Sequence, residues 1–299
     1  MTDPSAAMTA TITDQATPTA GGAPEGGRER NAGLWADAGR QLIRSPMFLV
    51  PLAYLLLVGS MAAFPRLWTS QDPRACDVAR SRIAPSWYHP FGFNNLGCDY
   101  YSHAVYGARP SLVIAIVATA GIVVIGGGAG LLAGFFSGWT DTIISRIVDI
   151  FFSLPFLLGA IVFLTVVGSR NIWTIARIMR GSVLSSKNLD YVAAAKALGS
   201  SNSRLMMKHI LPNAVAPVLV YSTIAVGVLI AAEATLTYLG VGLQRPAISW
   251  GLQISTGQSL LRTAPHLVLF PSIILSLTVM AFIMMGDALR DALDPRQRS

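Results

Sequence analysis

The sequence predicts an all-α protein that crosses a membrane several times. Of its 299 residues, 53% are hydrophobic and only 12% are charged, which is too apolar for a soluble domain of this size. Several uncharged runs are long enough to span the hydrocarbon of a bilayer as a helix, which takes about 20 residues. We expect six such spans, of which the fourth is unclear, with a polar loop on the cytoplasmic side.

The composition also excludes several classes of function. The net charge of +7 does not indicate nucleic-acid binding, because membrane proteins concentrate Lys and Arg in cytoplasmic loops and no long basic run with interleaved aromatics is present. The four histidines show no metal-ligand spacing with one another or with the cysteines. No HExxH, GxSxG or Walker A string occurs. We therefore expect no metal site, no catalysis and no ATP hydrolysis by this chain itself.

The N-terminal region predicts a disordered tail followed by a first span. Residues 1–33 are rich in Thr, Ala, Gly and Pro and cannot bury enough apolar surface to fold. The next segment, 34–64, contains an apolar run at 47–64 that begins too far from the start to be a cleaved leader. Arg40 and Arg44 precede this run, which predicts a cytoplasmic N-terminus.

Residues 65–110 should then form an external loop that contains both cysteines, Cys76 and Cys98. An external location permits oxidation, so we predict a disulfide that closes a loop of about twenty residues and contributes roughly 3 kcal/mol. Two free thiols are the alternative.

The transmembrane domain is expected at residues 111–290, and its clearest span is the uncharged run at 112–136. Four glycines recur every fourth residue in and just after it, which places them on one stripe where another helix can approach closely. They are Gly126, Gly130, Gly134 and Gly138. The cluster around Gly126 could suggest a nucleotide-binding loop, but it has no Lys and no preceding strand. A short polar turn at 139–149, in which Arg146 and Asp149 can pair, and a third span at 150–168 follow.

The fourth span is a difficulty for the predicted topology. Residues 169–186 carry three arginines, and a charge at mid-bilayer costs about 2.5–3.5 kcal/mol on the insertion scale. The apolar run at 172–179 is also too short to cross about 30 Å of hydrocarbon. Either this span is short, buried among other helices and partly formed by the third, or part of it has been lost.

Residues 187–213 form a basic island between apolar runs, and their order predicts two short helices at an angle. An Ala-rich helix at 189–198 should end at Gly199, which can take φ > 0. Ser200, Ser201 or Asn202 can cap a second helix at 203–210, which Pro212 should close. Between residues 177 and 212 six basic residues stand against one acidic residue, a cytoplasmic signature.

Two further spans are expected at 214–239 and 267–286, followed by a cytoplasmic tail at 291–299. Glu233 interrupts the first of them and should lie near the outer edge, about 30 Å beyond Pro212 at 1.5 Å per residue. A carboxylate in a span is a functional candidate by default. It could line the translocation pathway near an external gate, or be a paired Glu at a helix interface.

The alanine pair Ala194-Ala195, followed by Gly199 and then by Leu211-Pro212, resembles the EAA loop of ABC-importer permeases. In this sequence Ala193 stands in place of the usual Glu of that loop, and Asp190 could supply the acid one turn earlier. An ordinary amphipathic cytoplasmic hairpin is the alternative.

The final string GDALRDALDPR at 286–296 is similar to the carboxyl end of the dipeptide and oligopeptide branch of these permeases, which also includes nickel importers. His209, within His-Ile-Leu-Pro-Asn, is common in that branch. The resemblance extends over residues 89–296 and implies a six-span type I importer permease.

The resemblance implies that the loop at 187–213 docks on a cytoplasmic ATPase. The implied coupling residues are Asp190, Ala193, Ala194, Ala195, Gly199, His209, Leu211 and Pro212. It further implies a second permease subunit, two ATPase subunits that bind ATP and Mg²⁺, an extracytoplasmic peptide-binding protein, and a place in the plasma (inner) membrane with both termini cytoplasmic. No cofactor is expected in this chain. The alternatives are import of nickel or another small solute, a stand-alone secondary transporter or channel, which would need midplane carboxylates, and a membrane enzyme.

Overall fold

A computed structural model describes residues 34–153 and 171–293 of the chain, and every regular element in these two ranges is a helix. The predicted all-α fold is confirmed. The elements before the gap are α1 (Leu34–Arg44), α2 (Pro46–Ala63), α3 (Pro65–Trp68), η1 (Val78–Arg80), α4 (Tyr100–Phe136) and α5 (Trp139–Ser153). Those after it are α7 (Asn171–Ser186), α8 (Asp190–Ala197), α9 (Asn202–Arg204), η2 (Leu205–Ile210), α10 (Leu211–Ala214), α11 (Ala216–Tyr238), α12 (Trp250–Gly257), η3 (Gln258–Leu260) and α13 (His266–Leu293).

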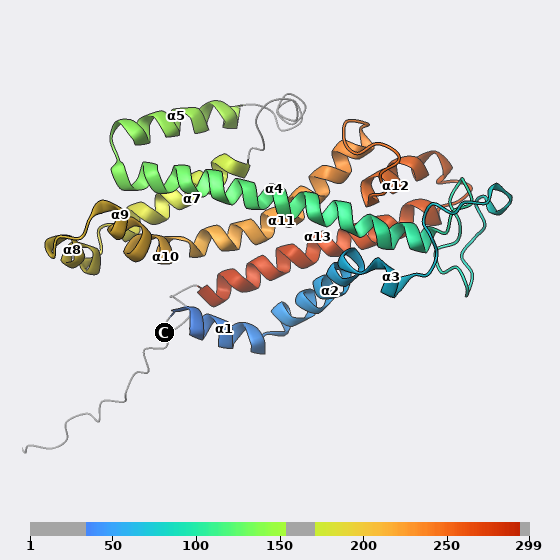
Figure 1. Ribbon diagram of the computed structural model, residues 1–299, viewed down its shortest axis with the longest axis horizontal. Coiled ribbons are helices and arrows are strands. Elements are labelled where there is room, and N and C mark those ends of the chain that lie inside the picture. Colours follow the sequence, from blue (N-terminus) through green and yellow to red (C-terminus); the bar gives the residue numbers. More distant parts are fainter. Residues whose placement is uncertain (1–33, 154–170, 294–299) are drawn as a thin grey trace, which may run out of the picture.

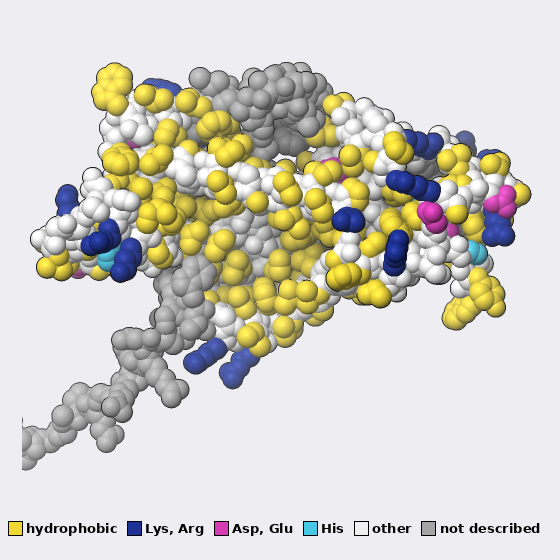
Figure 2. Space-filling view, in the orientation of Figure 1, with side chains coloured by type: hydrophobic (Ala, Val, Ile, Leu, Met, Phe, Trp, Pro, Cys, Tyr) yellow, Lys and Arg dark blue, Asp and Glu magenta, His cyan; other side chains and the backbone are white. Residues whose placement is uncertain are grey.

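The long helices α2, α4, α11 and α13 run along the long axis of the molecule (Figure 1). Within the described residues these four are long and apolar enough to cross a membrane. The flank of the bundle is mostly apolar, whereas Lys and Arg gather mainly toward its ends (Figure 2). Val50 and Leu56 of α2 are 67% and 65% exposed, which is the pattern of a helix whose outer face contacts lipid. Most of the predicted third span, residues 154–168, lies outside the described ranges.

Small residues let the long helices approach one another. In α11, a Cβ at Gly227 would lie 3.0 Å from the carbonyl oxygen of Val279 in α13. Val58, Ala108 and Ile230, from three different helices, belong to one buried apolar cluster. Without a hydrophobic driving force in lipid, such close van der Waals packing is what holds helices together.

Helix α4 begins at Tyr100, twelve residues before the predicted start of its span. Asp99 caps it, because its side chain accepts a hydrogen bond from the Ser102 backbone N–H at 3.0 Å. The helix therefore extends past the predicted span, and residues 100–110 are helical where a loop was expected.

The segment expected as a short polar turn is instead the 15-residue helix α5. The turn itself is confined to Ser137 and Gly138, both of which have positive φ. Ile143 and Ile147, four residues apart, give α5 a helical apolar period. The expected pair of Arg146 with Asp149 is wrong, because Asp149 pairs with a residue of α7.

Helix α7 has 16 residues and is about 24 Å long at 1.5 Å per residue, shorter than the hydrocarbon of a bilayer. Ile175 and Val183 are completely buried, and α7 contacts α4, α5, α10 and α11. Helix α7 is thus short and buried among other helices. This agrees with the expectation of a short, buried fourth span rather than with the loss of part of it. Any contribution from the third span would fall outside the described residues.

Candidate functional site

Residues 187–213, which we call the foot, lie at one end of the bundle. The segment between α3 and α4, which contains both cysteines, lies at the opposite end (Figure 1); we call it the outer loop after its predicted location. The foot joins α7 to α11 through four short elements, α8, α9, η2 and α10. The two ends of the protein therefore differ in structure. The whole length of the bundle separates the foot from the outer loop.

The first half of the foot has the local structure that its sequence predicts. Helix α8 ends at Ala197, and Gly199 follows with φ +80°. The backbone N–H groups of Gly199 and Ser200 donate to the carbonyls of Lys196 and Ala195 at 3.0 and 3.1 Å, which satisfies the end of the helix. Ser201 then caps α9 by accepting a hydrogen bond from a backbone N–H.

The second half of the foot differs from the prediction of one helix at 203–210 closed by Pro212. The backbone stays helical through Pro212, by way of the π-helix η2 and then α10. Pro212 lies in the first turn of α10, where a backbone N–H has no helical partner to lose. The foot is consequently joined to α11 by nearly continuous helical backbone.

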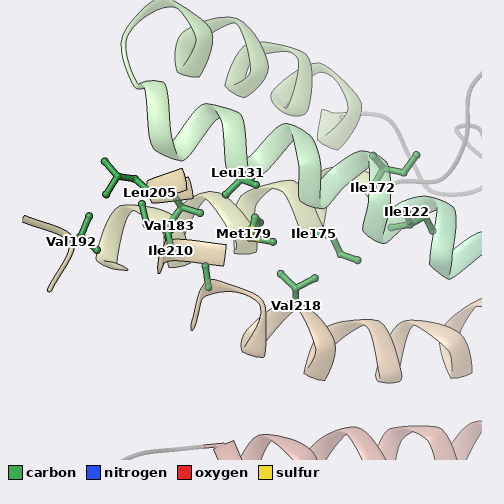
Figure 3. Close-up of a cluster of buried hydrophobic side chains, with 11 residues drawn as sticks. Ile122, Leu131, Ile172, Ile175, Met179, Val183, Val192, Leu205, Ile210 and Val218 are labelled. Atoms are coloured by element: carbon green, nitrogen blue, oxygen red, sulfur yellow. The ribbon is translucent and has the colours of Figure 1, made fainter. Parts of the chain in front are cut away.

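The inner face of the foot packs into a buried apolar cluster with the spans. Val192 of α8 and Leu205 and Ile210 of η2 are 5%, 3% and 0% exposed, and they pack with Val183 of α7 and Val218 of α11 (Figure 3). Close-packed interiors transmit displacement rather than absorb it. A force on the foot would therefore reach both α7 and α11.

The residues that the resemblance implies as coupling residues are exposed or half-buried on the surface of the foot. Asp190, Ala193, Ala194, Gly199 and Pro212 are exposed. Ala195, His209 and Leu211 are half-buried.

The exposed face of the foot also carries apolar residues that sequence reasoning did not select. Leu198 is 88% exposed and Met207 is 55% exposed. The exposed basic residues Lys196, Arg204 and Lys208 lie among them. A mixed apolar and basic surface on a rigid base is suited to contact with another protein.

Two polar side chains that were also missed fasten the halves of the foot together. Asn213 Nδ2 donates to the Tyr191 hydroxyl at 3.0 Å and to the His209 carbonyl at 3.1 Å. The Tyr191 hydroxyl donates to the same carbonyl at 3.3 Å. Both residues stand near the ends of the foot sequence, but their separation of 22 residues gives no local signal of the contact.

The arginines of α7 are paired with α5. Asp141 accepts from both Nε and Nη2 of Arg180, the latter at 2.7 Å, and Arg177 donates to Asp149. The Arg180 guanidinium holds the pKa of the Asp141 carboxyl below its usual value. Lys187, at the start of the foot, donates to the Ser137 hydroxyl at 2.7 Å. Two of the three arginines that made this span doubtful, Arg177 and Arg180, thus pair with a helix that was expected to be a turn; Arg170 lies outside the described residues.

Three of the four stripe glycines of α4 lie against α7. A Cβ would fall 2.2 Å from the Ile172 carbonyl oxygen at Gly126, 2.2 Å from that of Ala176 at Gly130, and within 3.0 Å of Val183 at Gly134. Gly138 does not belong to this contact, and its assignment to the stripe is wrong. It lies beyond the last residue of α4, at φ +65°, with nothing within 4 Å of its Cβ position.

Glu233 is buried where α4, α11 and α12 meet. Its carboxylate accepts hydrogen bonds from the hydroxyls of Thr237 at 2.9 Å, Ser249 at 3.2 Å and Ser111 at 3.3 Å. Ser249 also caps α12. This arrangement corresponds to a Glu paired at a helix interface, one of the two alternatives. Its partners were not identified from the sequence, because two of them lie 122 and 16 residues away.

In the outer loop, at the end of the bundle opposite the foot, Cys76 and Cys98 form a disulfide with their Cα atoms 4.0 Å apart. No group of three or more His, Cys, Asp or Glu that could hold a metal occurs in the ranges 34–153 and 171–293.

Comparison with known proteins places this architecture among transport proteins. Residues 126–299 match a family model described as binding-protein-dependent transport system inner membrane component. The chain is 36% identical over 276 residues to the dipeptide transport system permease protein DppC of Alkalihalophilus pseudofirmus, covering 89% of this chain and 91% of the relative. It is 36% identical over 282 residues to the oligopeptide transport system permease protein OppC of Bacillus subtilis (90% and 92% covered). Identity to the glutathione transport system permease protein GsiD of Pectobacterium atrosepticum is 34% over 277 residues (89% and 92%).

Proposed function

Because the chain belongs to the family of binding-protein-dependent transport system inner membrane components, we propose that it is one of two permease subunits of an ATP-driven importer of dipeptides or oligopeptides. The solutes named for its relatives, dipeptides, oligopeptides and glutathione, are all peptides. ATP and Mg²⁺ bind to two partner ATPases, and an extracytoplasmic binding protein delivers the solute.

The exposed face of the foot is the observation that supports this proposal most strongly. It presents Leu198 and Met207 among basic side chains, at the end of the bundle opposite the outer loop. The basic residues of the foot, together with Arg40 and Arg44 before α2, support a cytoplasmic position for this end. An ATPase that holds the foot in a groove would bury Leu198 and pair with the basic residues.

The packing of the foot gives the route by which ATP-driven movement reaches the spans. Its inner apolar face packs against α7 and α11, and α4 lies against α7 along the glycine stripe, so a displacement of the foot would be passed to all three helices. Closure of the ATPase dimer then shifts the population between inward-open and outward-open arrangements of the two permease subunits.

The test replaces an exposed apolar residue by Asp at each end of the molecule in the assembled importer in proteoliposomes. Leu198→Asp places a charge in the docking face without disturbing the interior, and we expect dipeptide uptake to fall tenfold or more, since an unpaired charge buried in an interface costs more than 1.4 kcal/mol. Val78→Asp is the matched control, because Val78 of the outer loop is 74% exposed, and it should retain uptake. Gly199→Asp should uncouple ATP hydrolysis from uptake in the same assay.

Membrane insertion of each variant is checked by its level in purified membranes. Normal uptake by a fully inserted Leu198→Asp importer would contradict the docking role of the foot.

A further inference from the structure

A cavity of about 330 Å³ lies at the outer end of the bundle. We call it the outer cavity. Its walls come from the outer loop, the first turns of α4, and the segment from Arg245 through Gly257 that contains α12. Its volume falls at the lower end of the range of small-molecule sites. The apolar part of its lining includes Leu96, Leu252 and Leu267.

One buried polar atom of the lining has no hydrogen-bond partner. Gln253 is 5% exposed, and its Nε2 donates to the His103 carbonyl at 2.7 Å. That bond fixes the orientation of the amide, since a carbonyl can only accept. Oε1 is thus an acceptor, and no described residue donates to it. A buried acceptor left in this way is costly unless a water or a ligand supplies a donor.

The charge of the lining is entirely positive. Arg74 and Arg245 line the cavity, and none of the lining residues is Asp or Glu. No ion pair of either arginine occurs among the described residues. Two other polar side chains of the lining are already engaged, since His103 Nε2 donates to the Pro73 carbonyl at 2.6 Å and the Thr256 hydroxyl donates to the Leu252 carbonyl at 2.9 Å. The cavity therefore offers two guanidinium groups, the side-chain amides of Asn94 and Asn95, and one buried acceptor.

We propose that the outer cavity binds the C-terminal end of a peptide. The terminal carboxylate pairs with Arg74 and Arg245, because a guanidinium matches a carboxylate with two parallel hydrogen bonds. A backbone N–H of the peptide donates to Gln253 Oε1, and a small terminal side chain lies on the apolar lining. A plain inorganic anion meets only the first of these requirements. The choice of peptide as the ligand class rests on the proposed function.

The test measures peptide binding to the full chain in lipid nanodiscs by isothermal titration calorimetry, without ATPases or binding protein. The probes are trialanine and its C-terminal amide, which lacks the carboxylate. We expect Arg245→Gln to weaken trialanine binding about tenfold or more, the effect of losing a charge-assisted hydrogen bond. The amide should bind the wild type at least tenfold more weakly than trialanine and should not respond to Arg245→Gln.

Two further variants sharpen the result. Arg262→Gln is the matched control, because Arg262 is exposed and lies outside the cavity lining, and it should leave both affinities unchanged. Gln253→Met removes the acceptor at similar length and should weaken both probes several-fold. An unchanged affinity in Gln253→Met would mean that a water satisfies the amide, and the proposal would be overturned.

The remaining outcomes separate this proposal from the proposed function. If Arg245→Gln leaves trialanine binding intact while Leu198→Asp still abolishes dipeptide uptake, the cavity is not a peptide site and the permease function stands. If the wild-type importer takes up no peptide at all, the solute class is wrong.

Discussion

The contact between α4 and α7 allows a sharp prediction at Gly130. A methyl group there would lie 2.2 Å from the Ala176 carbonyl oxygen and 2.9 Å from Met179 Cβ, whereas ordinary contacts begin at 3.4 Å. The helices would have to separate by about 3.4 − 2.2 = 1.2 Å at this point. Gly130→Ala should therefore destabilise the protein, because overpacking of a close-packed contact typically costs about 1–3 kcal/mol.

The matched control for this change is Gly128→Ala, two residues away on the same helix. Nothing lies within 4 Å of a Cβ at Gly128, so the better helix propensity of Ala should leave stability unchanged or raise it by up to about 1 kcal/mol. The two variants should differ by roughly 1–4 kcal/mol in the free energy of unfolding. At about 2–4 °C per kcal/mol, the melting temperature of Gly130→Ala should be lower by about 2–16 °C.

The measurement is thermal unfolding of both purified variants in the same detergent, followed by intrinsic fluorescence. A melting temperature of Gly130→Ala equal to that of Gly128→Ala would refute the close approach of α7 to the glycine stripe. Dipeptide uptake by the assembled importer should fall with Gly130→Ala for the same reason, since the foot moves α4 through α7.

Three other predictions concern the remaining contacts. Glu233→Leu deprives three buried hydroxyls of their acceptor and should cost about 1–3 kcal/mol for each hydroxyl left unpaired, with Glu233→Gln costing less, as measured by thermal unfolding. Arg180 lowers the pKa of Asp141, so their pair stabilises the α5–α7 contact above the carboxyl's unfolded pKa of about 4 and is lost as the pH falls through the lower folded pKa; hydrogen exchange in α5 should increase only in that acid range, and Asp141→Asn should reduce the pH dependence to what the Asp149–Arg177 pair contributes. Reduction of Cys76–Cys98 should destabilise the outer loop by roughly 3 kcal/mol and speed its proteolysis while the long helices stay protected; equal proteolysis before and after reduction would contradict this.

Much of the fold could be predicted because its strongest signals are local. The apolar run predicted at 47–64 is α2, Pro46–Ala63, and the one at 214–239 contains α11, Ala216–Tyr238. Hydrophobicity over about 20 residues is sufficient for such helices. Gly199 was predicted to take φ > 0 and does so, because the αL conformation at a helix end favours Gly over residues with a side chain.

The features that sequence reasoning missed depend on partners far along the chain. Helix α5 was read as a polar turn because its acidic residues pair with arginines 28 and 39 residues away. The same arginines made the fourth span doubtful, although the ion pairs offset their charge. At Pro212 a local rule failed, because the proline stands in the first turn of α10, directly after the π-helix η2.

The most direct test of the central proposal is photo-crosslinking from position 198, in cells that express the whole importer. A photoreactive amino acid replaces Leu198 at the tip of the foot. We expect a covalent adduct with a cytoplasmic ATPase subunit, and no reaction of Leu198→Cys with a membrane-impermeant thiol reagent added outside the cells. Labelling of that cysteine from outside, with no ATPase adduct from the photoreactive residue, would contradict the proposed role of the foot.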